Sequence, residues 1–164
     1  MQKSCAVLVT ALVLAVTAPA FAAPEFKHEG WTGHAAFTDG KFRQCLMWAS
    51  AINNYDVGFS LDPAGEMKLG LRSHKLDQTW PMLFNQKTAL RIQLDDGPVL
   101  TKAFASVSST LLTTSLKGTD WDKRLADGRL LRINTGSKVR VFHLTGIKAA
   151  LEKLRGCIAK HHAA

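Results

Sequence analysis

The sequence predicts a mainly β protein, an antiparallel β-sandwich with a short internal helix and a packed, amphipathic C-terminal helix. Between residues 31 and 144, short apolar runs alternate with clusters of Asp, Gly, Asn, Pro and Ser, as in strands joined by tight turns. A parallel sheet would need a helix between successive strands, so the close spacing of these runs favours antiparallel hairpins. The last segment of the chain instead has apolar residues at helical spacing.

Four strands are expected in the first half of the chain, after an extended leader at 24–30. They are residues 31–37, 42–50, 55–61 and 67–71. Asp39 and Gly40 separate the first two, and both residue types accept the positive φ angles of a hairpin turn. The third and fourth strands alternate in polarity and flank a turn signal, so they should pair as a hairpin.

The second half predicts five more strands and one short helix. The strands are expected at 88–94, at 99–106, around 111–112, at 129–133 and at 139–144. A helix should begin at Thr119, whose hydroxyl can cap the backbone, with Asp120 and Asp122 near its positive end. Gly128 should end it.

The C-terminal helix is the clearest helical pattern. Its apolar residues recur at spacings of three and four: Ile147, Ala150, Leu151, Leu154 and Ile158. Charged residues occupy the opposite side, so the apolar stripe should pack on the sheet. Cys157 lies close to that stripe and could face the strand that carries Cys45.

Residues 1–22 are expected to form a cleaved secretory signal peptide. Lys3 gives a positive start, residues 5–16 are uncharged, and Ala20-Phe21-Ala22 matches the small-x-small cleavage pattern. The remaining residues, 23–164, are the size of a single domain with its own core. No later apolar run approaches the ~20 residues of a membrane span. We therefore expect a periplasmic or secreted protein without a transmembrane segment.

Cleavage would leave Cys45 and Cys157 as the only cysteines, in an oxidising compartment that favours pairing. The sequence therefore predicts a Cys45–Cys157 disulfide. Such a bond would close a loop of about 113 residues, which by the loop-entropy estimate stabilises the fold by about 4–5 kcal/mol.

Several parts of the chain together resemble small exported bacterial β-sandwich proteins of the invasion-associated locus B family. The resemblance rests on Trp31, Cys45, the strands at 55–61, 67–71 and 129–133, and the ending Phe142-His143-Leu144-Thr145-Gly146-Ile147-Lys148-Ala149-Ala150-Leu151 with Cys157. It implies a periplasmic or surface β-sandwich with a flanking C-terminal helix, no known catalytic site and, in some members, an association with host-cell invasion. The same ending also resembles the TagO/VasI-type accessory proteins of type VI secretion. Unlike the locus B proteins, which have two neighbouring cysteines near the N-terminus, this chain has only Cys45 there.

The sequence contains no catalytic or metal-binding motif. It lacks Gly-x-Ser-x-Gly, Cys-x-x-Cys and His-Glu-x-x-His, and it has no phosphate loop, so no cofactor or metal is expected. His161-His162 is interpreted as a solvated tail and His143 as a half-buried, hydrogen-bonded strand histidine. An exported hydrolase with a dispersed site is the alternative function, drawing on Ser60, Ser73, Ser106 and Ser137 and on His34, His74 and His143.

A basic segment is the main candidate for binding. Its six cations are set against Asp127 alone: Lys123, Arg124, Arg129, Arg132, Lys138 and Arg140. Loss of Lys3 lowers the formal net charge from +8 to +7, so an anionic envelope component, or an unknown protein, is the expected partner. Nucleic acid is not expected, since the excess charge is scattered and an exported protein meets little of it. The sequence thus predicts a non-enzymatic interaction or envelope-associated protein, possible roles being in invasion or secretion, and an enzyme inhibitor using a loop at 74–86 is a further alternative.

Overall fold

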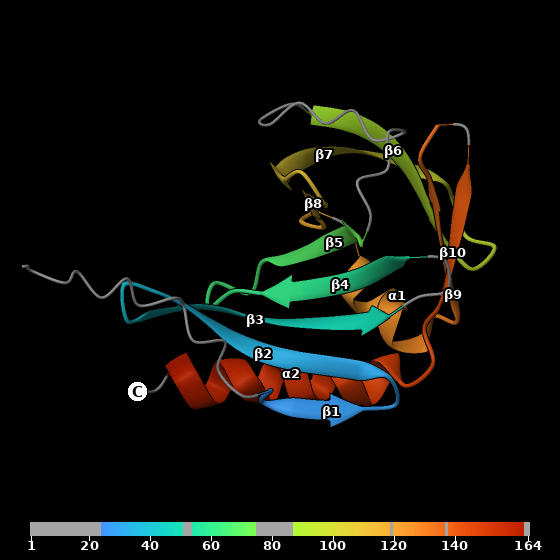
Figure 1. The fold of residues 1–164 in the computed structure, drawn as a ribbon. Helices are drawn as coiled ribbons and strands as arrows, with labels where there is room; N and C mark the ends of the chain where they lie inside the picture. Colours follow the sequence, from blue (N-terminus) through green and yellow to red (C-terminus); the bar gives the residue numbers. More distant parts are fainter. Residues whose placement is uncertain (1–23, 51–53, 75–86, 119, 137, 163–164) are drawn as a thin grey trace, which may run out of the picture.

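The computed structural model describes residues 24–50, 54–74, 87–118, 120–136 and 138–162. Ten strands and two helices make up this part of the chain (Figure 1). The strands are β1 (Phe26–His28), β2 (Trp31–Thr38), β3 (Lys41–Ser50), β4 (Tyr55–Leu61), β5 (Met67–Ser73), β6 (Lys87–Leu94), β7 (Leu100–Ser108), β8 (Leu111–Ser115), β9 (Leu130–Asn134) and β10 (Val139–His143). The helices are α1 (Trp121–Asp127) and α2 (Ile147–His162). The predicted fold class, mainly β with a short internal and a longer C-terminal helix, is confirmed.

All ten strands belong to one continuous antiparallel sheet in the order β1-β2-β3-β4-β5-β8-β7-β6-β9-β10. The predicted pairing of 55–61 with 67–71 is confirmed, since Val57 pairs with Leu71 and Phe59 with Leu69. The sheet bends strongly, and β9 and β10 stand across the direction of β3 and β4 (Figure 1). The predicted sandwich is therefore the two halves of one bent sheet, and it is not closed because β1 and β10 remain its two ends.

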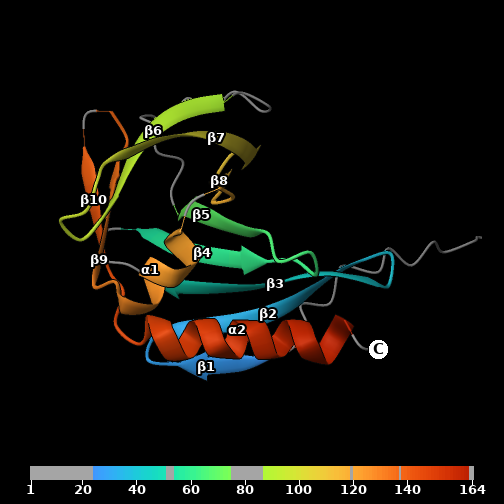
Figure 2. The same cartoon turned by 180° about the vertical axis from the view of Figure 1, so that it is seen from behind.

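The core lies between the inner face of this sheet and the two helices. Alternation places Trp31 of β2, Met47 of β3 and Phe59 of β4 on that face, each almost fully buried. Figure 2 shows both helices on one side of the strands β1 to β4. The predicted stripe of α2 is buried at Ile147, Ala150, Leu151 and Leu154. Burial of each of the three larger side chains, Ile147, Leu151 and Leu154, contributes about 1.5–3 kcal/mol relative to an exposed position.

Local signals predicted the first hairpin and the end of α1, but not the start of α1. Asp39 and Gly40 have φ angles of 52° and 72°, as the predicted β2–β3 turn requires. Gly128 follows the last residue of α1 and donates its N–H to the carbonyl of Leu125. The expected cap, Thr119, lies outside the described residues; Asp120 occupies the N-cap position, and its side chain makes no capping hydrogen bond.

The predicted disulfide is consistent with the fold. Cys45 of β3 and Cys157 of α2 have their sulfur atoms at bonding distance and their Cα atoms 6.1 Å apart, within the usual range for a disulfide. Both residues are buried, so the bond fastens α2 through the core to the middle of strand β3.

Trp48 covers the outer face of the sheet. Its Cα partner in β4 is Gly58, which in turn pairs with Gly70 of β5. A Cβ atom at Gly58 would lie 2.3 Å from the Trp48 ring and 2.7 Å from the Met47 carbonyl oxygen. The guanidinium of Arg72 lies 4.8 Å from the ring centroid on this same face. The absence of side chains at the two glycines thus allows the indole to lie flat on the strands.

Replacing both cysteines by alanine should lower the free energy of unfolding by about 4–5 kcal/mol, because the reduced unfolded chain gains conformational freedom. Thermal denaturation followed by circular dichroism should show a lower midpoint with an unchanged β signal. Dithiothreitol treatment of the unaltered protein should give a similar shift. Two titratable thiols in the denatured, unreduced protein would contradict the disulfide.

Gly58→Ala should destabilise the protein by about 1–3 kcal/mol, since the new methyl group must displace Trp48 or the backbone of β3. Gly156→Ala is the matched control. Gly156 lies in α2 with open space where a Cβ would be, and there alanine should stabilise by about 0.8–1 kcal/mol. Urea denaturation of the two variants measures both effects, and a neutral Gly58→Ala would show that the indole is not held against the sheet.

Candidate functional site

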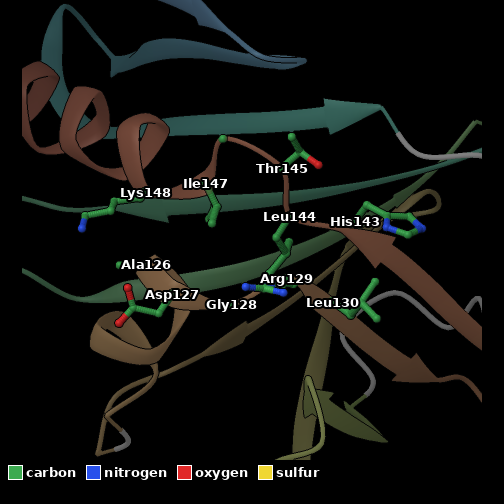
Figure 3. A pocket seen from close by; sticks show the side chains of 11 residues that line it. Ala126, Asp127, Gly128, Arg129, Leu130, His143, Leu144, Thr145, Ile147 and Lys148 are labelled. Atoms are coloured by element: carbon green, nitrogen blue, oxygen red, sulfur yellow. The ribbon is translucent and has the colours of Figure 1, made fainter.

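A surface pocket of about 510 Å³ lies where two loops meet, one from α1 to β9 and the other from β10 to α2 (Figure 3). Its lining consists of Ala126, Asp127, Gly128, Arg129, Leu130, His143, Leu144, Thr145, Gly146, Ile147 and Lys148. Leu130, Leu144 and Ile147 form an apolar floor, and the charged side chains lie at the exposed margin. We call this the loop pocket.

Backbone contacts hold the two loops in place. The N–H of Leu144 donates to the carbonyl of Arg129 at 2.9 Å, which continues the β9–β10 ladder into the pocket wall. The indole N–H of the buried Trp31 donates to the carbonyl of Thr145 at 2.8 Å. Gly146 has a φ of 71°, a conformation that favours glycine, and it turns the chain into α2. The pocket is therefore built on the core rather than on a free loop.

Charged side chains of both signs lie at the margin of the pocket. Arg129, His143 and Lys148 are exposed, and Asp127 is the one acidic residue of the lining. Figure 3 shows the Arg129 side chain in the middle of the view, between Asp127 and His143. The Glu29 carboxylate lies beside Gly146 of the lining. A Cβ atom built at Gly146 would be 2.4 Å from one oxygen of that carboxylate. Glu29 thus supplies a negative charge at the start of α2, whose first turn has no acidic residue of its own.

The structure distributes the six predicted anion-binding residues over several surfaces. Of the six, Arg129 lines the loop pocket. Lys123 lies exposed on α1, and Lys138 lies exposed just before β10. Arg132 and Arg140 lie on opposite faces of the β9–β10 ribbon, because Arg140 pairs with the buried Ile133, whereas Arg132 pairs with the exposed Val141.

Three of these arginines contact other groups. Arg124 lies over Gly97 and 4.0 Å from Asp120. Arg132 donates to the carbonyl of Asp95 and lies 3.6 Å from the Asp96 carboxylate. Arg140 donates to the Tyr55 hydroxyl at 2.8 Å, and its guanidinium lies 4.0 Å from the centroid of that ring. Anion binding by all six residues of the basic segment stays a prediction. The loop pocket is lined by a different set of basic side chains, Arg129, His143 and Lys148.

His143 and Lys148 are the two basic residues of the pocket lining that the sequence analysis did not select as binding residues. His143 was expected to be half-buried, and this expectation is wrong: its side chain is exposed, because it occupies the outer face of the edge strand β10. The sequence did contain a signal, since both residues flank Thr145-Gly146, where the strand pattern changes to the helical one.

A second polar cluster lies on the outer face beside Trp48. The carboxylate of Asp56 is almost fully buried, and it accepts hydrogen bonds from Nε, at 2.9 Å, and from the terminal nitrogen of Arg72. Nε2 of His74 lies 2.8 Å from the other carboxylate oxygen. Among the described residues, the contacts of His74 include no serine hydroxyl that would complete a catalytic triad. The geometry is that of a buried carboxylate held by the guanidinium of Arg72 and the imidazole of His74.

His161 is not part of the solvated tail that was expected, whereas His162 is exposed. His161 lies 2.7 Å from one carboxylate oxygen of Glu25, and Lys160 lies 2.7 Å from the other. The His161 ring stacks on Phe42 with centroids 5.3 Å apart and meets the edge of Phe37. The last turn of α2 is therefore fastened to the segment just before β1. In the described part of the chain no three potential metal ligands cluster together.

Comparison with protein-family models, curated proteins and solved structures finds no match for this chain. Of the two helices that the structure describes, neither has the length and apolar character to cross a membrane. The loop at 74–86, which was considered as an inhibitory loop, lies outside the described residues after His74, as do residues 1–22.

Glu25→Gln should destabilise the protein at pH 7 and have little effect at pH 3. Hydrogen bonds from Lys160 and then His161 lower the pKa of the Glu25 carboxyl in the folded protein. Its stabilising contribution is therefore fully present above the ordinary glutamate pKa, about 4.3, and is lost as the pH falls through the lower, folded value. Melting temperatures between pH 3 and pH 7 measure this. Glu152→Gln, at an exposed position of α2, is the control and should show a small difference at every pH.

Proposed function

We propose that this chain is an exported, non-enzymatic, envelope-associated binding protein that holds an anionic group in the loop pocket. The observation that carries the proposal is that three basic side chains, those of Arg129, His143 and Lys148, line one pocket that is fastened to the core. A rigid support matters because ordering a flexible cationic loop would offset much of the attraction.

The chemistry of the three side chains suits a phosphate or carboxylate. Arginine can donate two parallel hydrogen bonds to such a group, lysine adds a point charge, and histidine adds a donor whose charge depends on pH. The formal net charge of the mature chain, +7 after loss of Lys3, would also attract a polyanion over a longer range. Lipopolysaccharide phosphates and acidic phospholipid headgroups are the candidate ligands for a protein of the bacterial envelope.

The export part of the proposal rests on the signal-like first 22 residues and is supported by the cysteine pair at disulfide distance. The resemblance to the locus B proteins extends the proposal to a role in invasion or secretion. Export predicts that the protein isolated from the periplasm or culture medium has the intact mass of a chain that begins at Ala23. A cytosolic product that retains Met1 would contradict it.

Binding to vesicles tests the pocket directly. The mature protein should bind phosphatidylglycerol vesicles at low ionic strength, and binding should weaken with added salt. Replacing Arg129 and Lys148 together by glutamine should weaken binding about tenfold or more, because two charge-assisted contacts are lost.

The matched control replaces Arg43 of β3 and Lys153 of α2 by glutamine. Both are exposed and lie outside the pocket lining, so the net charge falls by the same amount while the pocket stays intact. Equal weakening in the two double variants would mean that net charge, not the pocket, determines binding. The absence of any binding at low salt, to these vesicles or to lipopolysaccharide, would contradict the proposal as a whole.

A further inference from the structure

The strand β10 forms one end of the open sheet, and none of the other described strands pairs with its outer edge. Two flanking hydrogen bonds show which residues of β10 bond to β9 and which point away from it. Leu144 donates to Arg129 at one end, and Thr135 donates to Lys138 at the other. In an antiparallel ladder every second residue exchanges bonds with the partner strand, so Arg140 and Phe142 also face β9. The N–H and C=O groups of Val139, Val141 and His143 therefore point away from the sheet.

These outward groups are accessible. Among the described residues, no backbone hydrogen bond reaches the N–H or C=O of Val139, Val141 or His143. The same three residues place their side chains on the outer face, where Val139 is 56% and Val141 49% exposed. Two exposed valines at alternate positions, beside unpaired backbone groups, give this edge the apolar and hydrogen-bonding character of a strand that lacks its neighbour.

The edge lacks two of the features by which proteins usually prevent strand addition, a β-bulge and a proline. Its pairing with β9 runs through five residues without a bulge, and it contains no proline. Its one arginine, Arg140, turns inward to Tyr55. By contrast, β1 at the other end of the sheet has three residues and contacts α2.

We propose that the free edge of β10 binds an extended acidic segment of a partner protein, which adds an eleventh strand to the sheet. Main-chain hydrogen bonds to Val139, Val141 and His143 would supply affinity, and apolar side chains of the segment would pack on the two valines. Basic side chains lie at both ends of the strand: Lys138 precedes it, and Arg129 and Lys148 lie beyond it in the loop pocket. A segment with carboxylates flanking an alternating apolar core matches this pattern of charge.

The same charges disfavour a second copy of this chain as the occupant. In an antiparallel pair of two β10 strands centred on Val141, Val139 of one copy lies opposite the other copy's equivalent of His143. This register places Lys138 of each copy opposite Leu144 of the other, at the end of the strand where the loop pocket with Arg129 and Lys148 begins. Like charges would therefore meet at both ends of the interface, whereas an acidic segment would neutralise them.

This inference goes beyond the proposed function, because it needs neither export nor a bound lipid. The test uses the mature chain and a fluorescein-labelled peptide, Asp-Glu-Val-Thr-Val-Thr-Val-Glu-Asp, measured by fluorescence anisotropy. A short strand buries little surface, so a dissociation constant in the micromolar range is expected. Methylating alternate peptide nitrogens removes the donors needed for pairing, and this peptide should bind at least tenfold more weakly. A peptide with Lys in place of its Asp and Glu should not bind measurably.

Two substitutions at Val141 distinguish main-chain pairing at the β10 edge from attraction by the surrounding charges. Val141→Pro removes an outward N–H that makes no bond within the sheet, and it should weaken peptide binding at least tenfold. Val141→Thr keeps that N–H and the β-branched shape, and it should change binding less than threefold. Vesicle binding should be unchanged in both variants, so a failure of the edge is distinguishable from a failure of the pocket. If Val141→Pro does not fold, the methylated peptide on the unaltered protein still decides the question.

Three outcomes would overturn the proposal. The first is equal binding of the methylated and unmethylated peptides, which would mean attraction by charge alone. The second is no binding of the acidic peptide at 1 mM. The third is a concentration-dependent dimer that is abolished by Val141→Pro, which would make a second copy the occupant of the edge.

Discussion

The docking of α2 against β2, β3 and β4 is the interaction on which the rest of the structure depends. The buried stripe of α2 covers the inner face of these strands, and the Cys45–Cys157 bond passes through the same contact. At the start of α2, the indole N–H of Trp31 donates a hydrogen bond to the carbonyl of Thr145. At the end of α2, the carboxylate of Glu25 contacts Lys160 and His161. The loop pocket begins where α2 begins, so the positions of Lys148 and Gly146 follow from this docking.

The bend of the single sheet separates two kinds of surface. Its inner face is filled by large apolar side chains and the helices, whereas its outer face uses small residues, such as Gly58 and Gly70, under one tryptophan. Bending without closure leaves the sheet with two ends. One end contacts α2, and the other lies beside the loop pocket, so the unpaired backbone and the basic side chains occur on the same region of the molecule.

Local patterns were sufficient to predict most elements, because alternation, turn residues and helical spacing depend on near neighbours in the sequence. The β2–β3 turn at Asp39-Gly40 and the buried stripe of α2 are examples. The strand order could not be predicted in the same way, since the pairing of β5 with β8 and of β6 with β9 joins distant segments. Arg132 and Arg140 are eight residues apart, yet one faces outward and the other inward, and this depends on the register with β9. The exposure of His143 and the contact of His161 with Glu25 likewise depend on which distant element lies beside them.

The position of α2 after all ten strands in the sequence also bears on the order in which the protein can fold. Synthesis proceeds from the N-terminus, and β2, β3 and β4 are complete about a hundred residues before Cys157 is added. Until then, Trp31, Met47 and Phe59 have no helix to cover them, and Glu25 has neither of its two bases. A nascent chain therefore lacks its completed core until α2 has been synthesised. Until then the apolar inner face of β2, β3 and β4 stays uncovered, and the growing chain exposes to other molecules the surface that the folded protein buries most completely.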